Sequence, residues 1–170
     1  DERWLVPHFE KMLYDNAQLA RVYLAASQLT RDPEYRRVAS ETLDYVIREM
    51  QSADGGYFSA TDADSEGEEG KFFVWAREEV EEIVGAADAA CFCAFYDIRE
   101  GGNWEGKNIA NTPRNLASVA ADLRLSSEEL GASLSRAKDK LYQARSQRVP
   151  PLLDDKILTA WNGLMIGAMA

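Results

Sequence analysis

The sequence predicts a mainly α-helical fold with a small β-hairpin inserted between helices. Three segments carry apolar residues at the helical spacing of three and four, namely 9–29, 33–50 and 156–170. Apolar residues cover a wide arc of the first and third segments, but only one side of the second. An inner helix has apolar neighbours on most sides, whereas an outer helix has them on one side. The pattern therefore predicts a layer in which inner and outer helices alternate.

Residues that typically begin or end helices define the expected helix boundaries more closely. Asp32 is a typical N-cap residue, and Pro33 after it suits the first helical position. Ser126 with Glu129 forms a capping box, which predicts another outer-type helix that runs to about residue 148. Shorter helices are expected at 76–84, ended by a glycine, and at 87–96.

The segments between these helices contain turn and strand signals. The runs GYFSAT (56–61) and KFFVW (71–75) predict a two-stranded hairpin with an acidic loop between its strands. Residues 99–113 are rich in Gly and Asn and are expected to form a long loop. Pro150 and Pro151 predict an extended linker before the last helix, which is expected to begin at Lys156.

Composition excludes several classes of partner. The net charge of −10, without a dense basic block, argues against nucleic acid and against an anionic membrane surface. No apolar run could span a bilayer and no signal peptide opens the chain, so a cytoplasmic protein is expected. The two cysteines, Cys91 and Cys93, are expected to be reduced and partly buried, and with one histidine we expect no metal site. No phosphate-binding or dinucleotide motif occurs, so no cofactor is expected.

Both ends of the sequence suggest a piece of a larger domain. The chain starts without Met, and it ends inside an apolar helical run that has no stop signal. We therefore expect residues 1–170 to be a fragment of one domain. Inner helices left open in a fragment would favour self-association.

The acidic loop TDADSEGEEG supplies the first candidate site. Asp62, Asp64 and Glu66 match the front half of a calcium-binding EF-hand loop, but Phe73 occupies the position of its last ligand. The loop is therefore either a solvated acidic turn, or a set of carboxylates that face a ligand and act as acid and base.

Three further stretches contain candidate binding residues, each with a structural alternative. The lone His8 precedes the first helix, and Asp15 and Asn16 are polar residues in that broadly apolar helix; a lone histidine in such a place is more often structural. In the Gly-rich loop, Trp104 and Glu105 suit a sugar, although a packed tryptophan would look the same. The last stretch offers Asp155, Trp161 and Asn162. Asp154 and Asp155 could instead cap the helix that follows and favour its dipole.

Four stretches carry a resemblance to a known family: VPHFEKMLYDNAQLA, GGYFSATDADSEGEEGKFFVW, NWEGKNI and LLDDKILTAWNGLM. In this order, and over essentially the whole chain, they resemble the thioredoxin-domain-containing proteins of the YyaL and spermatogenesis-associated type. In that family a thioredoxin-like domain precedes a six-hairpin (α/α)6 toroid, similar to those of N-acylglucosamine 2-epimerases and six-hairpin glycosidases. The resemblance implies that residues 1–170 are part of such a toroid, without the thioredoxin-like domain and the remaining hairpins.

Two functions are compatible with these observations. The first is a carbohydrate-active domain, a glycoside hydrolase or a sugar epimerase, with acid/base chemistry by carboxylates: Asp62, Asp64, Glu66 and Asp155. The remaining candidates would bind the sugar: His8, Asp15, Asn16, Trp104, Glu105, Trp161 and Asn162. The alternative is a non-catalytic scaffold that holds a partner or its own thioredoxin-like domain. The resemblance to the epimerases would imply a mechanism that uses a pair of histidines. The single His8 cannot supply such a pair by itself.

Overall fold

The computed structural model describes residues 1–170 and is mainly helical, as predicted, with small antiparallel sheets. The chain divides into two compact units. Residues 8–63 and 151–170 form one unit, called the sheet unit below because it contains the three-stranded sheet. Residues 1–7 and 64–150 form the other, called the four-helix unit.

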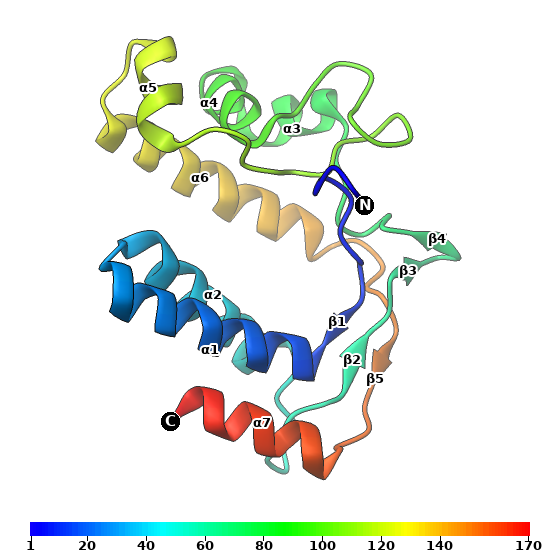
Figure 1. Ribbon diagram of the computed structural model, residues 1–170. Helices are drawn as coiled ribbons and strands as arrows, with labels where there is room; N and C mark the ends of the chain where they lie inside the picture. Colours follow the sequence, from blue (N-terminus) through cyan, green and yellow to red (C-terminus); the bar gives the residue numbers. More distant parts are fainter. The chain divides into compact units, whose positions relative to one another are not determined.

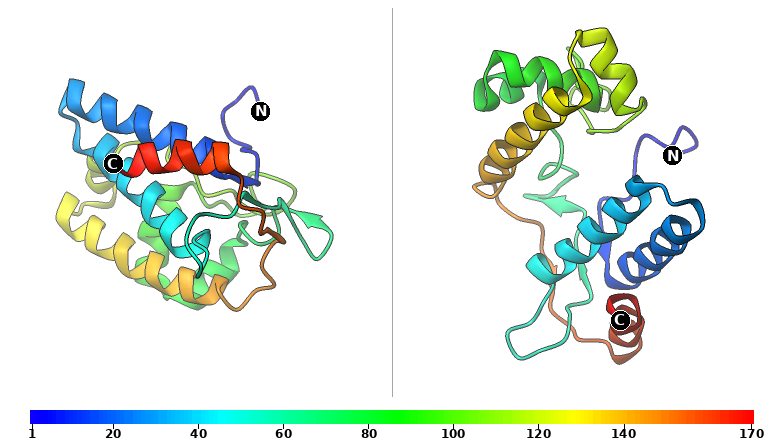
Figure 2. Two further views of the ribbon diagram at one scale, coloured as in Figure 1. Left: turned by 90° about the horizontal axis from the view of Figure 1, so that it is seen from below. Right: turned by 90° about the vertical axis from the view of Figure 1, so that its left-hand side faces the viewer.

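The sheet unit has three helices: α1 (Leu13–Thr30), α2 (Pro33–Glu49) and α7 (Thr159–Met169). Helix α1 packs against both α2 and α7 (Figure 1). Helices α1 and α7 run in the same direction and α2 runs opposite to them, as Figure 2 also shows. The core between them contains fully buried Leu13, Val46, Met50 and Met165. The wide apolar arc predicted for the first helix therefore serves contacts with two helices.

A three-stranded antiparallel sheet lies where α1 and α7 begin. Its strands are β1 (Lys11–Met12), β2 (Ala60–Thr61) and β5 (Leu153–Asp154), with β2 in the middle. β1 leads directly into α1, and α7 begins shortly after β5. The sheet thus holds the starts of two parallel helices together.

The four-helix unit contains α3 (Arg77–Val84), α4 (Ala86–Tyr96), α5 (Leu116–Leu123) and α6 (Ser127–Arg145). α6 packs against the other three helices, over a core that includes Val80, Phe92, Val119 and Leu130. The capping box at Ser126 is confirmed: its hydroxyl accepts from the Glu129 N–H, and the Glu129 carboxylate accepts from the Ser126 N–H. A short hairpin, β3 (Asp64–Ser65) with β4 (Glu68–Glu69), also belongs to this unit.

Helix α5 was not expected from the sequence. Its N-cap is Asn115, whose side-chain oxygen accepts from the Ser118 N–H at 2.8 Å. Asn before an alternation of small and apolar residues is a start signal, but eight residues are too short for a clear helical stripe.

Two helices begin later than expected. The first begins at Leu13 rather than Phe9, because Lys11 and Met12 pair with β2. The last begins at Thr159 rather than Lys156, with Leu158 at its N-cap position. The alternative in which Asp154 and Asp155 cap this helix is therefore wrong, since Leu158 occupies the N-cap position and no side chain caps the helix.

The predicted pairing of 56–61 with 71–75 is also wrong. Thr61 pairs with Lys11 and Leu153, which are distant in sequence. Trp75 forms an isolated bridge with Asn108, and the hairpin that does form is the shorter one of β3 and β4. Local apolar patterning identifies extended segments but not their partners, because pairing depends on tertiary structure.

The cysteine prediction is confirmed. Cys91 and Cys93 are free thiols buried on α4, in the core of the four-helix unit. Burial raises the pKa of the Cys93 thiol, which lowers the fraction present as the reactive thiolate. Both residues therefore act as small apolar core side chains.

No helix has the length and the apolar character needed to cross a membrane.

Several large apolar side chains remain exposed on α1 and α7. On α1, Leu19 and Val22 lie one turn apart and are 52% and 64% exposed, and Ile166 on α7 is 64% exposed. An inner helix with such a surface has room for further apolar neighbours. The expected self-association concerns this surface and stays a prediction.

Acid should weaken the four-helix unit through Asp88. The Arg136 guanidinium at 2.6 Å, and then the Ser133 hydroxyl at 2.7 Å, hold the pKa of Asp88 below its usual 3.8. Because the folded-state pKa is depressed, the stabilisation is present above the unfolded value and is lost as pH falls through the folded-state value. Denaturant midpoints measured between about pH 5 and pH 3 should fall less for Asp88→Asn than for the unchanged protein. Asp139→Asn, on the exposed side of α6, should leave the acid dependence as it was.

Candidate functional site

Seven of the predicted site residues belong to the sheet unit. Each lies in or beside a strand of the three-stranded sheet, or in the opening turns of α1 and α7. They are His8, Asp15, Asn16, Asp62, Asp155, Trp161 and Asn162. The other four belong to the four-helix unit and are Asp64, Glu66, Trp104 and Glu105.

An aromatic pair joins the starts of α1 and α7. The rings of Tyr14 and Trp161 contact edge to face, with centroids 4.8 Å apart and planes at 67°. Both side chains are half-buried, so part of their apolar surface remains accessible. Such a pair can stack against the C–H face of a sugar ring while its own packing fixes the geometry. The sequence singled out Trp161 but not Tyr14, because no local pattern indicates that the two rings meet.

Two polar residues, Asp15 and Asn16, directly follow Tyr14 in the first turn of α1. Asp15 is exposed, where the N-terminal end of the helix dipole favours a carboxylate. Asn16 is half-buried, and its side-chain N–H donates to the Met12 carbonyl at 2.8 Å. That bond fixes the amide and leaves its oxygen as an acceptor. His8 is exposed, three residues before β1.

Asn162 has a clear structural task. Its side chain is buried, and its amide oxygen accepts from the Tyr57 N–H at 2.7 Å. Both amide hydrogens are also used, by the carbonyls of Tyr57 and Leu158. The residue therefore ties the loop before β2 to α7, and a role in binding sugar stays a prediction.

Asp62 and Asp155 lie at opposite ends of the β2–β5 ladder. Asp62 follows β2, and its N–H donates to the Leu152 carbonyl at 2.8 Å, before β5 begins. Asp155 follows β5, and the two strands are antiparallel. A third acid lies between them: Asp154 pairs with Lys156 at 2.8 Å, and this hydrogen bond lowers the pKa of Asp154.

The sequence missed two hydroxyl residues beside these acids. Ser59 is buried, and both its N–H and its hydroxyl donate to the Asp154 carbonyl at 3.1 Å. The Thr61 hydroxyl oxygen is also buried, but it has no hydrogen-bond partner. No sequence signal marks either residue, because Ser and Thr are ordinary members of short strands.

In the four-helix unit, the acidic loop forms an exposed hairpin. Asp64 and Glu66 are exposed, while Ser65 between them is buried and donates to the Val149 carbonyl at 2.6 Å. Lys71 lies 3.3 Å from Glu66 and 3.4 Å from Glu68, and these carboxylates raise the pKa of Lys71. This arrangement is that of a solvated acidic turn, one of the two alternatives considered from the sequence.

Two glutamates occupy the same unusual backbone position. Glu66 has φ 55° and precedes Gly67, and Glu105 has φ 47° and precedes Gly106. Trp104 and the residue after Gly106 exchange backbone hydrogen bonds of 3.0 and 2.8 Å, so Glu105 is the first central residue of a two-residue hairpin turn. Asn or Gly suits this left-handed conformation better than Glu does. Glu105 is exposed and Trp104 is half-buried.

Arg148 holds the base of the acidic hairpin in place. Its guanidinium donates to the carbonyls of Phe72 and Val74 at 2.8 and 2.9 Å, and to that of Lys71 at 3.3 Å. It also pairs with Glu79 at 2.7 Å and lies 3.9 Å from the centre of the Trp75 ring. The sequence did not single out this residue, which links the end of α6 to the start of α3.

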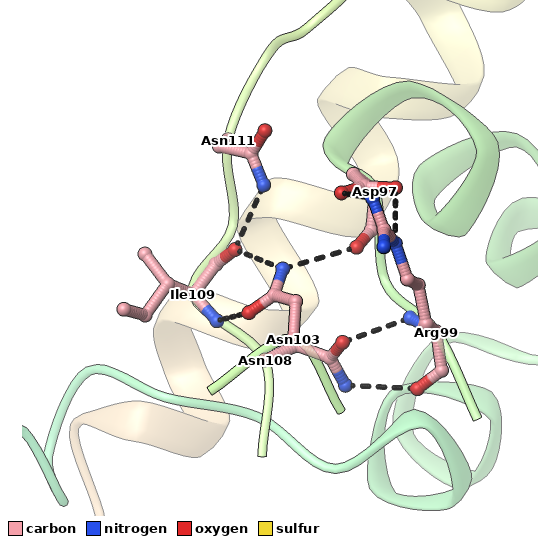
Figure 3. Close-up of polar contacts among 6 residues, drawn as sticks. All are labelled: Asp97, Arg99, Asn103, Asn108, Ile109 and Asn111. Carbon is pink, nitrogen blue, oxygen red and sulfur yellow. Dashed lines mark hydrogen bonds and ion pairs between the residues drawn. The ribbon is translucent and has the colours of Figure 1, made fainter. Parts of the chain in front are cut away.

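Asparagine side chains build the loop that contains Trp104 (Figure 3). Asn108 is 1% exposed; its amide donates to the carbonyls of Trp75 and Arg99 and accepts from the Arg99 N–H. Asn103 donates to the Ile109 carbonyl and accepts from the Ile109 N–H at 3.0 and 2.8 Å. The stretch NWEGKN therefore owes its asparagines to loop geometry, whatever Trp104 binds.

The sites offer carboxylates, amides and aromatic faces, but no metal cluster. No group of three or more His, Cys, Asp or Glu side chains is arranged to hold a metal ion. The carboxylates, amides and aromatic faces themselves suit hydrogen bonding, stacking on aromatic faces and proton transfer.

The fold and these sites define a mainly helical protein whose polar and aromatic residues gather at helix starts and in asparagine-built loops. No family model matches the chain. It is 38% identical to spermatogenesis-associated protein 20 of Homo sapiens, over 100% of this chain and 25% of that protein. The rat protein of the same name is 36% identical over the same shares, and an uncharacterized protein of Caenorhabditis elegans is 31% identical over 96% of this chain and 26% of its own length.

The chain thus spans about a quarter of the length of these relatives. The similarity supports the spermatogenesis-associated part of the resemblance found in the sequence. The toroid and the thioredoxin-like domain of that family stay predictions.

Proposed function

We propose that this chain is part of a carbohydrate-active (α/α)6 toroid, with a sugar-binding site at the starts of α1 and α7. The observation that carries the proposal is the Tyr14–Trp161 pair, an accessible aromatic surface between two parallel helix starts. Asp15 and Asn16 follow Tyr14 in the same turn and suit hydrogen bonds to sugar hydroxyls. The exposed apolar side chains of α1 and α7 are consistent with further helices in the same layer.

The proposed reaction is glycoside hydrolysis or epimerisation, with carboxylates as acid and base. In the sheet unit, Asp62 and Asp155 are the candidates, and in the four-helix unit Asp64 and Glu66. The free, buried state of both cysteines suits the cytoplasmic location that forms part of the proposal.

Trp161→Leu tests the binding site. With a panel of mono- and oligosaccharides, the unchanged protein should show a sugar-dependent rise in Tm, because a ligand that binds the folded state stabilises it. Trp161→Leu should lose about tenfold or more in affinity for the same sugar, since an aromatic platform is removed, and Trp161→Phe should retain most of it.

Trp4→Leu is the matched control, because Trp4 is 96% exposed and lies in the other unit. It should leave sugar binding unchanged. A sugar that binds equally well to Trp161→Leu would rule out this site, and the absence of any shift across the panel would remove the carbohydrate function altogether.

A second candidate is a non-catalytic scaffold for a partner or for the protein's own thioredoxin-like domain. The exposure of Asp62, Asp64 and Glu66 favours it, since catalytic carboxylates are usually enclosed. Asp62→Asn with Asp64→Asn should then weaken binding of the thioredoxin-like domain, measured by calorimetry in trans, and leave all sugars without effect.

A further inference from the structure

We infer that residues 64–150 are an inserted module that folds and unfolds independently of the sheet unit. The chain leaves the sheet unit after Ala63 and returns to it at Pro151. β2 and β5, on the two sides of this excursion, are antiparallel neighbours in one sheet. The whole excursion therefore occupies the position of a hairpin loop between two paired strands.

Hydrogen bonds hold the two ends of the module together, one within the module and one within the sheet unit next to it. Inside the module, the buried Ser65 donates to the Val149 carbonyl at 2.6 Å. Inside the sheet unit, the Asp62 N–H donates to the Leu152 carbonyl at 2.8 Å. Insertion of one domain into another is tolerated where the ends of the insert are close, because the host chain then closes with little distortion.

Each unit has a hydrophobic core of its own. The buried residues of one core lie between Trp75 and Leu141, and those of the other in α1, α2, the residue after α2 and α7. The main helix packings follow the same division, with α1 against α2 and α7, and α3 to α6 against one another. Burial of apolar surface dominates cooperativity, so two separate cores favour two separate unfolding units.

The sheet unit also closes without the module. Its two chain segments are joined by the Asn162 amide, which bonds both the N–H and the carbonyl of Tyr57. Ser59 joins them a second time through the Asp154 carbonyl. Met165 completes the core from the second segment and is fully buried.

The test is hydrogen exchange, read by mass spectrometry, on the whole chain with a matched pair of core substitutions. Leu130 on α6 and Met165 on α7 are both 0% exposed, one in each core. Leu130→Ala should speed exchange of the α3–α6 amides on the order of 30-fold or more, and leave α1, α2 and α7 unchanged. Met165→Ala should do the reverse.

Each result of this experiment either supports or contradicts independent unfolding of the module. If Leu130→Ala unfolds the module completely, retained protection in α1 and α2 still supports independence. Equal acceleration in all helices for either variant would show one cooperative unit and overturn the inference. Acceleration limited to α6 in Leu130→Ala would also contradict it, because the module would then not open as a unit.

Discussion

Arg148→Ala is expected to lower the free energy of unfolding of the four-helix unit by about 4 kcal/mol, because a half-buried charge network loses its centre. The guanidinium bonds three carbonyls between Lys71 and Val74, pairs with Glu79 and covers the Trp75 ring. Its removal leaves these carbonyls and the Glu79 carboxylate without the donor that they share. Chemical denaturation followed by far-ultraviolet circular dichroism measures the change.

Arg148→Lys separates charge from shape. Lysine keeps the positive charge but cannot bond several carbonyls and a carboxylate in one plane, nor stack on Trp75. It should therefore recover less than half of the loss. Arg21→Ala, on the exposed side of α1, is the control and should stay within about 0.5 kcal/mol of the unchanged protein. A loss under about 1 kcal/mol for Arg148→Ala would mean that the network does not stabilise the unit.

Asn108→Asp is expected to cost a similar amount, about 4 kcal/mol, because it puts an acid where the loop needs a buried donor. The amide N–H groups of Asn108 donate to the carbonyls of Trp75 and Arg99 at 3.2 and 3.1 Å. A carboxylate would direct an oxygen at these two carbonyls from a site that is 1% exposed. The loop from 99 to 111 and its bridge to Trp75 should both be lost.

The pH dependence of this variant identifies the cause. Burial and facing carbonyls disfavour the ionised acid, so the folded-state pKa of Asp at this position would be raised. Its destabilisation should therefore shrink as pH falls and the acid becomes protonated, opposite to the trend expected from Asp88. Asn115→Asp at the N-cap of α5 is the matched control and should change stability little, since Asp is an equally good N-cap. Equal effects at both positions would contradict the argument.

Much of the helical structure could be predicted from local signals. Asp32, Pro33 and the Ser126–Glu129 capping box located two helix starts correctly, because an N-cap bond joins residues a few positions apart. The buried thiols of Cys91 and Cys93 were also predictable, since their neighbours on α4 are apolar. The late start of α1 was not predictable, because a distant strand holds Lys11 and Met12 extended. Residues 155–158, between β5 and α7, form neither strand nor helix, and no local signal predicts this delay.

The candidate site was predicted in part. Residue type alone pointed to Trp161, but its partner Tyr14 emerges only when α1 and α7 lie together. Asn162, chosen as a sugar ligand, is a backbone clamp on Tyr57 across most of the chain. Arg148 was missed for the same reason, since the carbonyls that it bonds belong to a different part of the sequence.

The sequence by itself determined the helical class, most helix segments and the similarity to spermatogenesis-associated protein 20. It also showed that the acidic loop does not match an EF-hand, because Phe73 occupies the position of the last calcium ligand. Each of these depends on spacing or identity within a continuous stretch. Only the tertiary structure decided that β2 lies between β1 and β5, and that residues 64–150 form a connection between two paired strands. Strand partners are chosen by backbone hydrogen bonds and core packing between remote segments, and no local pattern encodes that choice.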